Sequence, residues 1–282
     1  MEMLSVKCKD QYGNSIDFNK DNNYTIIEVT GINPIKSQIN TSTIIGAPGS
    51  LFNYSHAENR SIVLYVAIDD YGSDARMRLN KMFRTGMLID LFFNEYSIQG
   101  YVESNEYNAF DKKIITQISL VCVQPYFVKN NPDDVIQITN VENLFHFPYQ
   151  SISSGIEMSR IINFQYPIGY VFNKGEFKTG CIFQIEALET MQNIIIYNLT
   201  NNQIFKFDAN YTLNVGDSLV IDTRFNNKSV RCNGNDVYNN VVYNSDWIEL
   251  DLGRNEIKLV FTSSYNHIPI FSVKKFDLFG GI

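Results

Sequence analysis

The chain has 282 residues, 44% of them hydrophobic and 19% charged, which is the composition of a folded protein with one large or two ordinary domains. Its net charge of −7 and its lack of a basic cluster argue against sequence-specific nucleic-acid binding. Apolar stretches are far shorter than the ~20 residues that a membrane-spanning helix needs, so we expect no membrane insertion. The 4 cysteines form no Cys-x-x-Cys pair, so we expect reduced, buried thiols in place of a zinc site.

The first half of the chain alternates apolar and polar residues, a pattern that predicts β-strands. Aromatic residues make up 13% of the chain, which also favours strands. The alternation begins at residues 4–8, and further strands are predicted over 61–69, 87–93, 96–103 and 114–123. Only residues 73–86 have a helical period, with Arg76, Arg78, Lys81 and Arg84 lying around an apolar face.

The second half begins with a region of different character. Residues 129–160 are rich in turn formers and are interpreted as a linker or arm. After them, turn signals recur about every ten residues, which is typical of an all-β sandwich. Strands are predicted near 181–187, 192–198, 203–208, 218–223, 228–232, 236–243, 246–250, 255–262 and 269–277, and Asn233-Gly234 predicts a type I′ hairpin turn. The predicted domains are therefore 1–128 and 161–282, joined by 129–160.

The sequence offers few groups for chemistry. Its 3 histidines lack metal-ligand spacing, and it contains neither a nucleophile elbow nor a phosphate-binding loop. Four aspartates could converge on calcium at sandwich loops, but they lack the ordered spacing of an EF-hand, so we do not expect a calcium site there: Asp208, Asp217, Asp222 and Asp236. We therefore expect no catalytic residue, no cofactor and no metal site.

Exposed aromatic side chains on a β-sandwich can stack on sugar rings. The candidates for such stacking are Trp247, Tyr238 and Tyr243. The competing interpretation places Trp247 in the core, and the alternation of residues 245–250 does not decide which face it occupies.

Three segments of the first half resemble the siphophage tail component family, which includes the distal tail proteins. They are Gly31-Ile32-Asn33-Pro34 with Gly46-Ala47-Pro48-Gly49, then Arg60-Ser61-Ile62-Val63-Leu64, and then the strand that ends in Cys122-Val123-Gln124-Pro125-Tyr126-Phe127. The second half is similar to the C-terminal domain of the same family at Thr179-Gly180, Val215-Gly216-Asp217, Asn233-Gly234 and Leu252-Gly253-Arg254. Pro48-Gly49 departs from the family's frequent Asp-Gly, which puts the shape of that loop in doubt.

The resemblance implies a mainly β protein with an N-terminal tail-tube-like β-barrel or sandwich carrying one helix. It also implies a C-terminal galectin-like (jelly-roll) β-sandwich on the outside of a ring of six copies. The implied partners are the tail tube protein, a baseplate hub or tail-associated protein, the tape-measure protein and receptor-binding proteins. The implied location is the tail tip of the virion, after assembly in the host cytoplasm. We expect acidic channel walls, because these would repel the phosphates of passing DNA.

The main hypothesis is a structural tail protein without catalytic activity. The expected contacts between copies are the helix at 73–86, with Arg76, Arg78 and Arg84, and the loop at 31–55, with Phe52 and Pro48. One alternative is a carbohydrate-binding module that grips cell-wall polymer. Another is a glycoside hydrolase appended to a tail, which would need two facing carboxylates.

Overall fold

The computed structural model describes residues 4–21, 23–46, 48–68, 73–107, 114–130, 134–143, 159–162, 167–264 and 267–282. The chain forms two compact units, which are Met1–Asn130 together with Leu278–Ile282, and Asn131–Asp277. We call them unit 1 and unit 2. The segment expected to be a linker contains three short strands: β11 (Val135–Gln137), β12 (Asn140–Asn143) and β13 (Ser159–Ile162).

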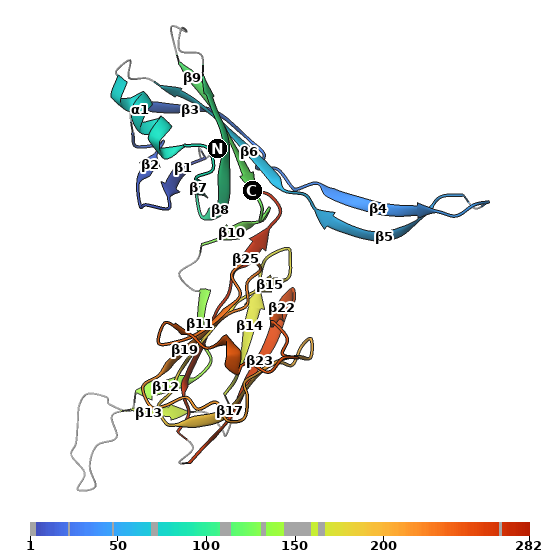
Figure 1. Cartoon of the computed structure of the whole chain (residues 1–282), viewed down its shortest axis with the longest axis vertical. Helices are drawn as coiled ribbons and strands as arrows, with labels where there is room; N and C mark the ends of the chain where they lie inside the picture. The colour runs from blue at the N-terminus through green and yellow to red at the C-terminus, as the bar shows by residue number, and fades with distance from the viewer. Residues whose placement is uncertain are drawn as a thin grey trace. The chain divides into compact units, whose positions relative to one another are not determined.

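Unit 1 is built on a nine-stranded sheet with the order β2-β1-β7-β8-β9-β6-β3, to which β10 adds beside β8 and β25 adds beside β10 (Figure 1). Neighbouring strands of this sheet pair antiparallel, as in the ladders that join β6 to β9 and β7 to β8. The strands are β1 (Val6–Asp10), β2 (Ser15–Asp17), β3 (Tyr24–Thr30), β6 (Arg60–Ile68), β7 (Leu88–Phe93), β8 (Tyr96–Tyr107), β9 (Ile115–Cys122), β10 (Phe127–Lys129) and β25 (Asp277–Phe279).

A single helix, α1 (Ser73–Met82), covers the core of unit 1 in the described part of the chain. Its buried Ala75, Leu79 and Met82 recur at helical spacing and pack with the inward side chains of the sheet, so the predicted apolar face is confirmed. The helix is shorter than the predicted 73–86. Gly86 has φ +82° and its N–H donates to the carbonyl of Val102, so it belongs to the turn that leads into β7.

The segment predicted as a loop over 31–55 is largely a β-hairpin. Strands β4 (Ser37–Thr43) and β5 (Ser50–Ala57) pair with each other alone and project from the nine-stranded sheet (Figure 1). The chain runs from β3 into β4 and returns from β5 into β6, so the hairpin extends a ladder of the main sheet. We call this hairpin the arm.

Unit 2 is a β-sandwich of two antiparallel sheets. One sheet has the order β11-β24-β16-β19-β20-β21 and the other the order β14-β23-β17-β18. Facing side chains such as Phe183, Phe271, Ile196 and Leu259 fill the space between them and are fully buried. The strands are β14 (Ile168–Asn173), β15 (Thr179–Gly180), β16 (Ile182–Glu186), β17 (Met191–Asn198), β18 (Gln203–Lys206), β19 (Ser218–Asp222), β20 (Ser229–Cys232), β21 (Asn235–Asp236), β22 (Glu249–Leu250), β23 (Gly253–Ser263) and β24 (Ile270–Lys274).

In unit 2, one predicted hairpin turn is confirmed and the strand predicted after it is wrong. Asn233 and Gly234 both have positive φ, 50° and 84°, so the predicted hairpin turn between β20 and β21 is confirmed. The strand predicted over 236–243 is wrong, because β21 ends at Asp236 and a 3₁₀ turn, η2 (Tyr238–Asn240), follows. The Asp236 carboxylate accepts a hydrogen bond from the backbone N–H of Tyr238, which favours this turn over an extended strand.

The mainly β class and the β-sandwich are confirmed. Among the described residues, no helix combines the length and the apolar composition that crossing a bilayer requires. All four cysteines are free: Cys8, Cys122 and Cys181 are buried, and Cys232 is half-buried.

We predict that the folded protein hides most of its thiols from thiol–disulfide exchange with an added reagent. Burial raises the pKa of Cys122 to about 12 and raises the pKa of Cys8 and Cys181 further, so these groups stay protonated at pH 8. Titration with a chromogenic disulfide reagent should therefore detect no thiol other than Cys232 in the native protein and four thiols in denaturant. Prompt native reaction of Cys181 would contradict the core described for unit 2.

Candidate interaction surfaces

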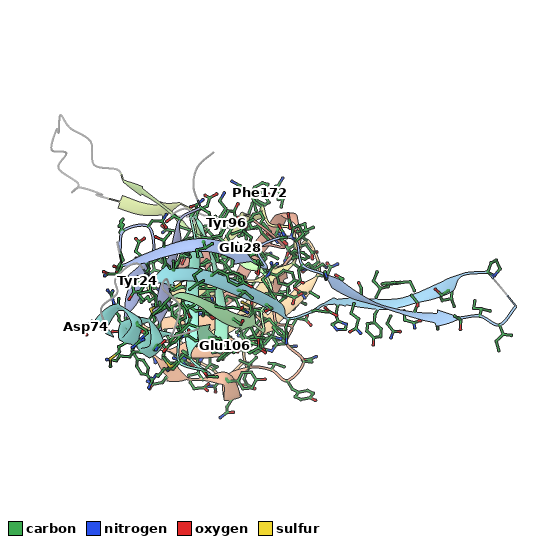
Figure 2. All side chains as sticks on the ribbon, turned by 90° about the horizontal axis from the view of Figure 1, so that it is seen from above. Tyr24, Glu28, Asp74, Tyr96, Glu106 and Phe172 are labelled. Carbon is green, nitrogen blue, oxygen red and sulfur yellow. The ribbon has the colours of Figure 1, made fainter. Side chains whose placement is uncertain are left out.

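The arm exposes apolar side chains that no other described part of unit 1 covers. Every residue of β4 and all but the last of β5 are exposed. Phe52 is 64% exposed and Ile45, at the tip, is 102% exposed, and Ile39, Ile44, Leu51 and Tyr54 are exposed as well. Figure 2 shows the side chains standing along both sides of the projecting ribbon. An isolated two-stranded hairpin is marginally stable in water, so this surface is suited to burial by a partner.

The arm also lacks charged side chains. Residues 37–57 contain no Lys, Arg, Asp or Glu. Natural proteins usually protect exposed strand edges with charges, because an unprotected edge pairs with other chains. A neutral hairpin can be buried without the desolvation of an ionised group, so this composition favours close packing against another surface.

Arg60 is the main polar contact at the root of the arm. It is the first residue of β6 and only 4% exposed, and its guanidinium lies over the Phe127 ring, 4.6 Å from the centroid. Its Nη1 donates to the carbonyls of Gly31 and Asn33, at 2.5 and 2.8 Å. Nε donates to the carbonyl of Pro125 at 2.7 Å, and Nη2 donates to the carbonyl of Gly280. Burial lowers the pKa of Arg60, but a guanidinium keeps its charge in proteins, so these bonds are charge-assisted.

Two glycines allow the chain segments to meet at this root. Gly31 has φ +84°, and a Cβ there would lie 2.0 Å from the carbonyl oxygen of Ser61. A Cβ on Gly281 would lie 2.6 Å from the backbone nitrogen of Pro34. Because any larger residue would displace backbone at either position, the root needs glycine at both.

The expected contact residues occupy two different surfaces of unit 1. Phe52 and Pro48 lie on the exposed arm. On α1, Arg78 is already engaged, because it pairs with Asp21 at 2.8 Å and donates to the carbonyl of Ser15. Arg84 is exposed, next to Met87. Arg76 is half-buried, with its guanidinium 6.0 Å from the centroid of the Tyr107 ring.

Unit 2 has an apolar outer surface on its four-stranded sheet. Ile168, Tyr170 and Phe172 point outward from β14 and are 43%, 45% and 49% exposed. The strand register places them beside Lys258, Glu256 and Arg254 of β23, and continues through Tyr197 of β17 to Ile204 of β18. We call these eight residues the β14 face. The Arg254 guanidinium lies over the Tyr170 ring, 3.5 Å from the centroid.

The outer surface of the opposite sheet of unit 2 carries more polar side chains, and Ile182, Val220 and Ile270 also face outward there. Gln184 and Glu186 of β16 align with Ser272 and Ile270 of β24, and Lys274 follows on the same face. A sandwich surrounded by water is expected to be polar on both outer faces. The β14 face is therefore a candidate interface, because it combines aromatic residues with an arginine, a composition typical of binding hot spots.

The three aromatic residues proposed for sugar stacking do not form one open platform. Trp247 and Tyr238 stack on each other, with ring centroids 6.0 Å apart and planes at 10°. Trp247 also packs edge-on against the buried Phe205 and is partly buried in the core, as its competing interpretation holds. Tyr243 stands alone in solvent at 103% exposure.

The four aspartates considered for calcium form separate local contacts. Asp208 and Asp236 each accept a backbone N–H two residues ahead, and Asp217 accepts from the Asn233 amide. Asp222 forms a two-pronged ion pair with Arg224, at 2.7 Å at its shortest. Within the described ranges, no group of three or more His, Cys, Asp or Glu side chains is arranged to hold a metal.

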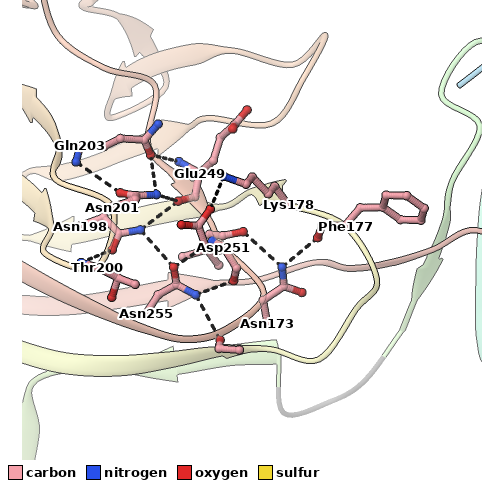
Figure 3. Close-up of polar contacts among 12 residues, drawn as sticks. Asn173, Phe177, Lys178, Asn198, Thr200, Asn201, Gln203, Glu249, Asp251 and Asn255 are labelled. Atoms are coloured by element: carbon pink, nitrogen blue, oxygen red, sulfur yellow. Dashed lines mark hydrogen bonds and ion pairs between the residues drawn. The ribbon is translucent and has the colours of Figure 1, made fainter. Parts of the chain in front are cut away.

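A network of buried amides joins the strand ends of unit 2 (Figure 3). Asn198 and Asn255 are fully buried, and the Asn198 amide donates to Asn255 Oδ1 at 3.2 Å and to the carbonyl of Glu249 at 2.9 Å. Asn255 in turn donates to the carbonyl of Asp251, and its Oδ1 accepts from the Asp251 N–H. At the rim of the network, Lys178 pairs with Asp251 at 2.7 Å. The network holds the β22–β23 connection against β17, so its role is architectural.

The comparisons with known proteins agree with this architecture. Residues 174–271 match the family model described as the siphovirus-type tail component, C-terminal domain. The resemblance to the siphophage tail component family is therefore confirmed. No curated protein matches the chain.

Solved structures match the chain over nearly its full length. The crystal structure of the SPP1 Dit (gp 19.1) protein superimposes with a TM-score of 0.68 and 13% identity, covering 99% of this chain and 100% of that one. A chain of the phage p2 baseplate in its activated conformation with Sr superimposes with a TM-score of 0.55 and 8% identity, covering 97% of this chain and 98% of that one. At these identities the matches establish a shared fold.

We predict that Asn255→Ala destabilises unit 2 by about 1–3 kcal/mol, because it leaves buried partners without hydrogen bonds. Trp247 is the only tryptophan of the chain and lies in unit 2, so its fluorescence in a urea titration reports that unit alone. The matched control is Asn227→Ala, an exposed position, which should shift the midpoint little. Equal midpoints for the two variants would contradict the role assigned to the network.

Proposed function

We propose that this chain is a structural protein of a phage tail, located at the distal tail or baseplate, with no catalytic activity. The observation that carries the proposal is the arm: an uncharged, apolar hairpin rooted in a compact β unit. The family match of residues 174–271 and the fold shared with the SPP1 Dit protein support it. On this proposal, unit 1 assembles with further copies into a ring of six, and unit 2 carries docking surfaces for neighbouring proteins.

Ring closure requires a heterologous interface, in which one patch of each copy meets a different patch of the next. The arm is our candidate for one of these patches, with Phe52 and Pro48 on it. The basic side chains of α1 and of the turn that follows it, Arg76, Arg78 and Arg84, are a second candidate contact. Such a ring would join the tail tube, and the tape-measure protein with it, to the baseplate hub and the receptor-binding proteins. It would take this place at the tail tip after assembly in the host cytoplasm.

The proposed occupant of the β14 face is another protein of the tail tip. Its flat array of aliphatic and aromatic side chains resembles the centre of a protein interface more than a sugar site, because Ile168, Ile204 and Phe172 offer no hydrogen bonds to hydroxyls. The cations Arg254 and Lys258, which outnumber the single Glu256, favour a partner with acidic groups around an apolar centre.

The alternative function is carbohydrate binding by unit 2. It would rest on Tyr238, which is 52% exposed on its stack with Trp247, and on the solvent-exposed Tyr243. Retention of the full chain on purified cell-wall polymer, lost on Tyr238→Ala with an unchanged fold, would support this alternative.

We predict that the purified chain forms six-copy particles and that Ile45→Asp with Phe52→Asp reduces these to monomers, because the charges cannot be buried in the interface. Mass photometry at matched concentrations measures both. The control pair is Val215→Asp with Phe225→Asp, which are 65% and 69% exposed on loops of unit 2 and should leave the particle intact. Six-copy particles that persist in the arm variant would contradict the role of the arm.

We also predict that a photo-crosslinking amino acid at Phe172 captures a different tail protein in assembled particles. The same group at Gln184, on the more polar outer face of the other sheet, is the matched control and should capture far less. Mass spectrometry of the crosslinked product identifies the captured chain. A product that contains copies of this chain alone, or equal capture at both positions, would contradict the assignment of the β14 face.

A further inference from the structure

The last residues of the chain return to unit 1 and bind the root of the arm. Residues 278–282, which we call the return segment, follow the whole of unit 2 in the sequence but belong to unit 1. The Phe279 ring packs edge-on against Tyr96, with centroids 5.5 Å apart. The Ile282 N–H donates to the carbonyl of Ile32 at 3.1 Å, on the chain that leads into β4.

Gly280 makes the central contact of the return segment. Its carbonyl accepts hydrogen bonds from Arg60 Nη2 and from the backbone N–H of Ile35, the latter at 3.1 Å. Gly281 then lies so close to Pro34 that a Cβ would not fit. The return segment thus contacts both sides of the arm's root: residues 32–35, which enter β4, and Arg60, which follows β5.

Without the return segment, the root of the arm loses several of the contacts that fix its position. One guanidinium donor and the Ile35 N–H lose their shared acceptor, and leaving buried donors unpaired is costly. Arg60 Nη1 would keep its bonds to the carbonyls of Gly31 and Asn33, but the first backbone hydrogen bond of the ribbon, from the Glu58 N–H to the carbonyl of Lys36, is long at 3.3 Å. A two-stranded ribbon fixed only at such a root would vary in direction.

We propose that the return segment is a lock that fixes the direction of the arm, so that the arm becomes competent to pair only after residues 278–282 have been made and unit 1 has been completed. Domains generally fold in order of synthesis, N-terminal first, so unit 1 emerges with its exposed apolar arm long before residues 278–282 exist. An arm without a fixed direction cannot pair in a defined position with a neighbouring copy. The lock therefore delays pairing between copies until unit 2 has been made. The inference rests on the proposed ring assembly and adds a control on its timing.

The test compares the full chain with a variant that ends at Asp277. Spin labels at Ser42→Cys on the arm and Lys9→Cys on β1, in a Cys232→Ser background diluted with unlabelled protein, give the distribution of arm positions by pulsed electron resonance. We expect a narrow distribution in the full chain and a broad one in the shortened chain. Mass photometry should show at least a tenfold loss of six-copy particles in the shortened chain.

A synthetic peptide of residues 276–282 tests whether the missing contact can be restored to the shortened chain. Added to the shortened chain, it should narrow the distance distribution and restore the particles, whereas the same peptide with Gly281→Val should do neither, because its side chain would clash with Pro34. In case the shortened chain does not fold, the full-length Gly281→Ala variant tests the same contact, with unit 2 monitored by Trp247 fluorescence.

The possible outcomes test the lock and the ring independently of each other. A shortened chain, or a Gly281→Ala chain, that keeps both a narrow distribution and normal particles would overturn the lock while leaving the ring intact. A full chain that forms no particles, but whose arm distribution broadens on shortening, would leave the lock standing and contradict the ring. Rescue by the Gly281→Val peptide as effective as by the native sequence would also overturn the lock.

Discussion

A single buried guanidinium organises the part of this protein that is best suited to assembly. Arg60 donates hydrogen bonds to carbonyls on both the entry to the arm and the return segment, and it stacks on Phe127. Planar donors with fixed directions suit such a junction, because Arg60 bonds three separate backbone segments at once. A lysine, with one flexible ammonium, would not hold the same directions. The root of the arm, the return segment and the connection between β9 and β10 are thereby fixed to one another.

Both units are built mainly of β-strands, but unit 1 also extends a hairpin beyond its core. Unit 2 fills its sandwich with buried apolar side chains and joins its strand ends by the Asn198–Asn255 network. Unit 1 has a comparable core under its sheet, but it also extends two strands beyond that core into an apolar arm without charges. Because such a hairpin gains little from its own contacts, burial against another surface would stabilise it.

The sequence predicted the mainly β class, the helix and the sandwich because each has a regular period with one buried face. It did not predict the arm's strands, since both faces of β4 and β5 are exposed and the alternation that marks a half-buried strand is missing. The signal that remained was the absence of charge over residues 37–57. The β14 face was also not predicted. Its outward side chains alternate with the buried Val171, so the strand is apolar on both faces and its sequence does not show which face is exposed.

The contacts of Arg60 lie beyond what the sequence indicates, because its acceptors are backbone carbonyls. Arg60 and Gly280 are 220 residues apart in the chain, and no pattern at Gly280 marks its carbonyl as an acceptor. Trp247 posed a different difficulty: its segment alternates, but it joins the core through Phe205 while stacking on Tyr238, so it belongs to neither face alone.

We propose that this chain acts by shape and self-association at the end of a phage tail. The most direct measurement is a density map of the intact particle at a resolution that traces the chain. The account predicts six copies encircling the distal end of the tail, with each arm buried against the neighbouring copy. Copies found elsewhere in the particle, or a ring in which the arms remain in solvent, would contradict it.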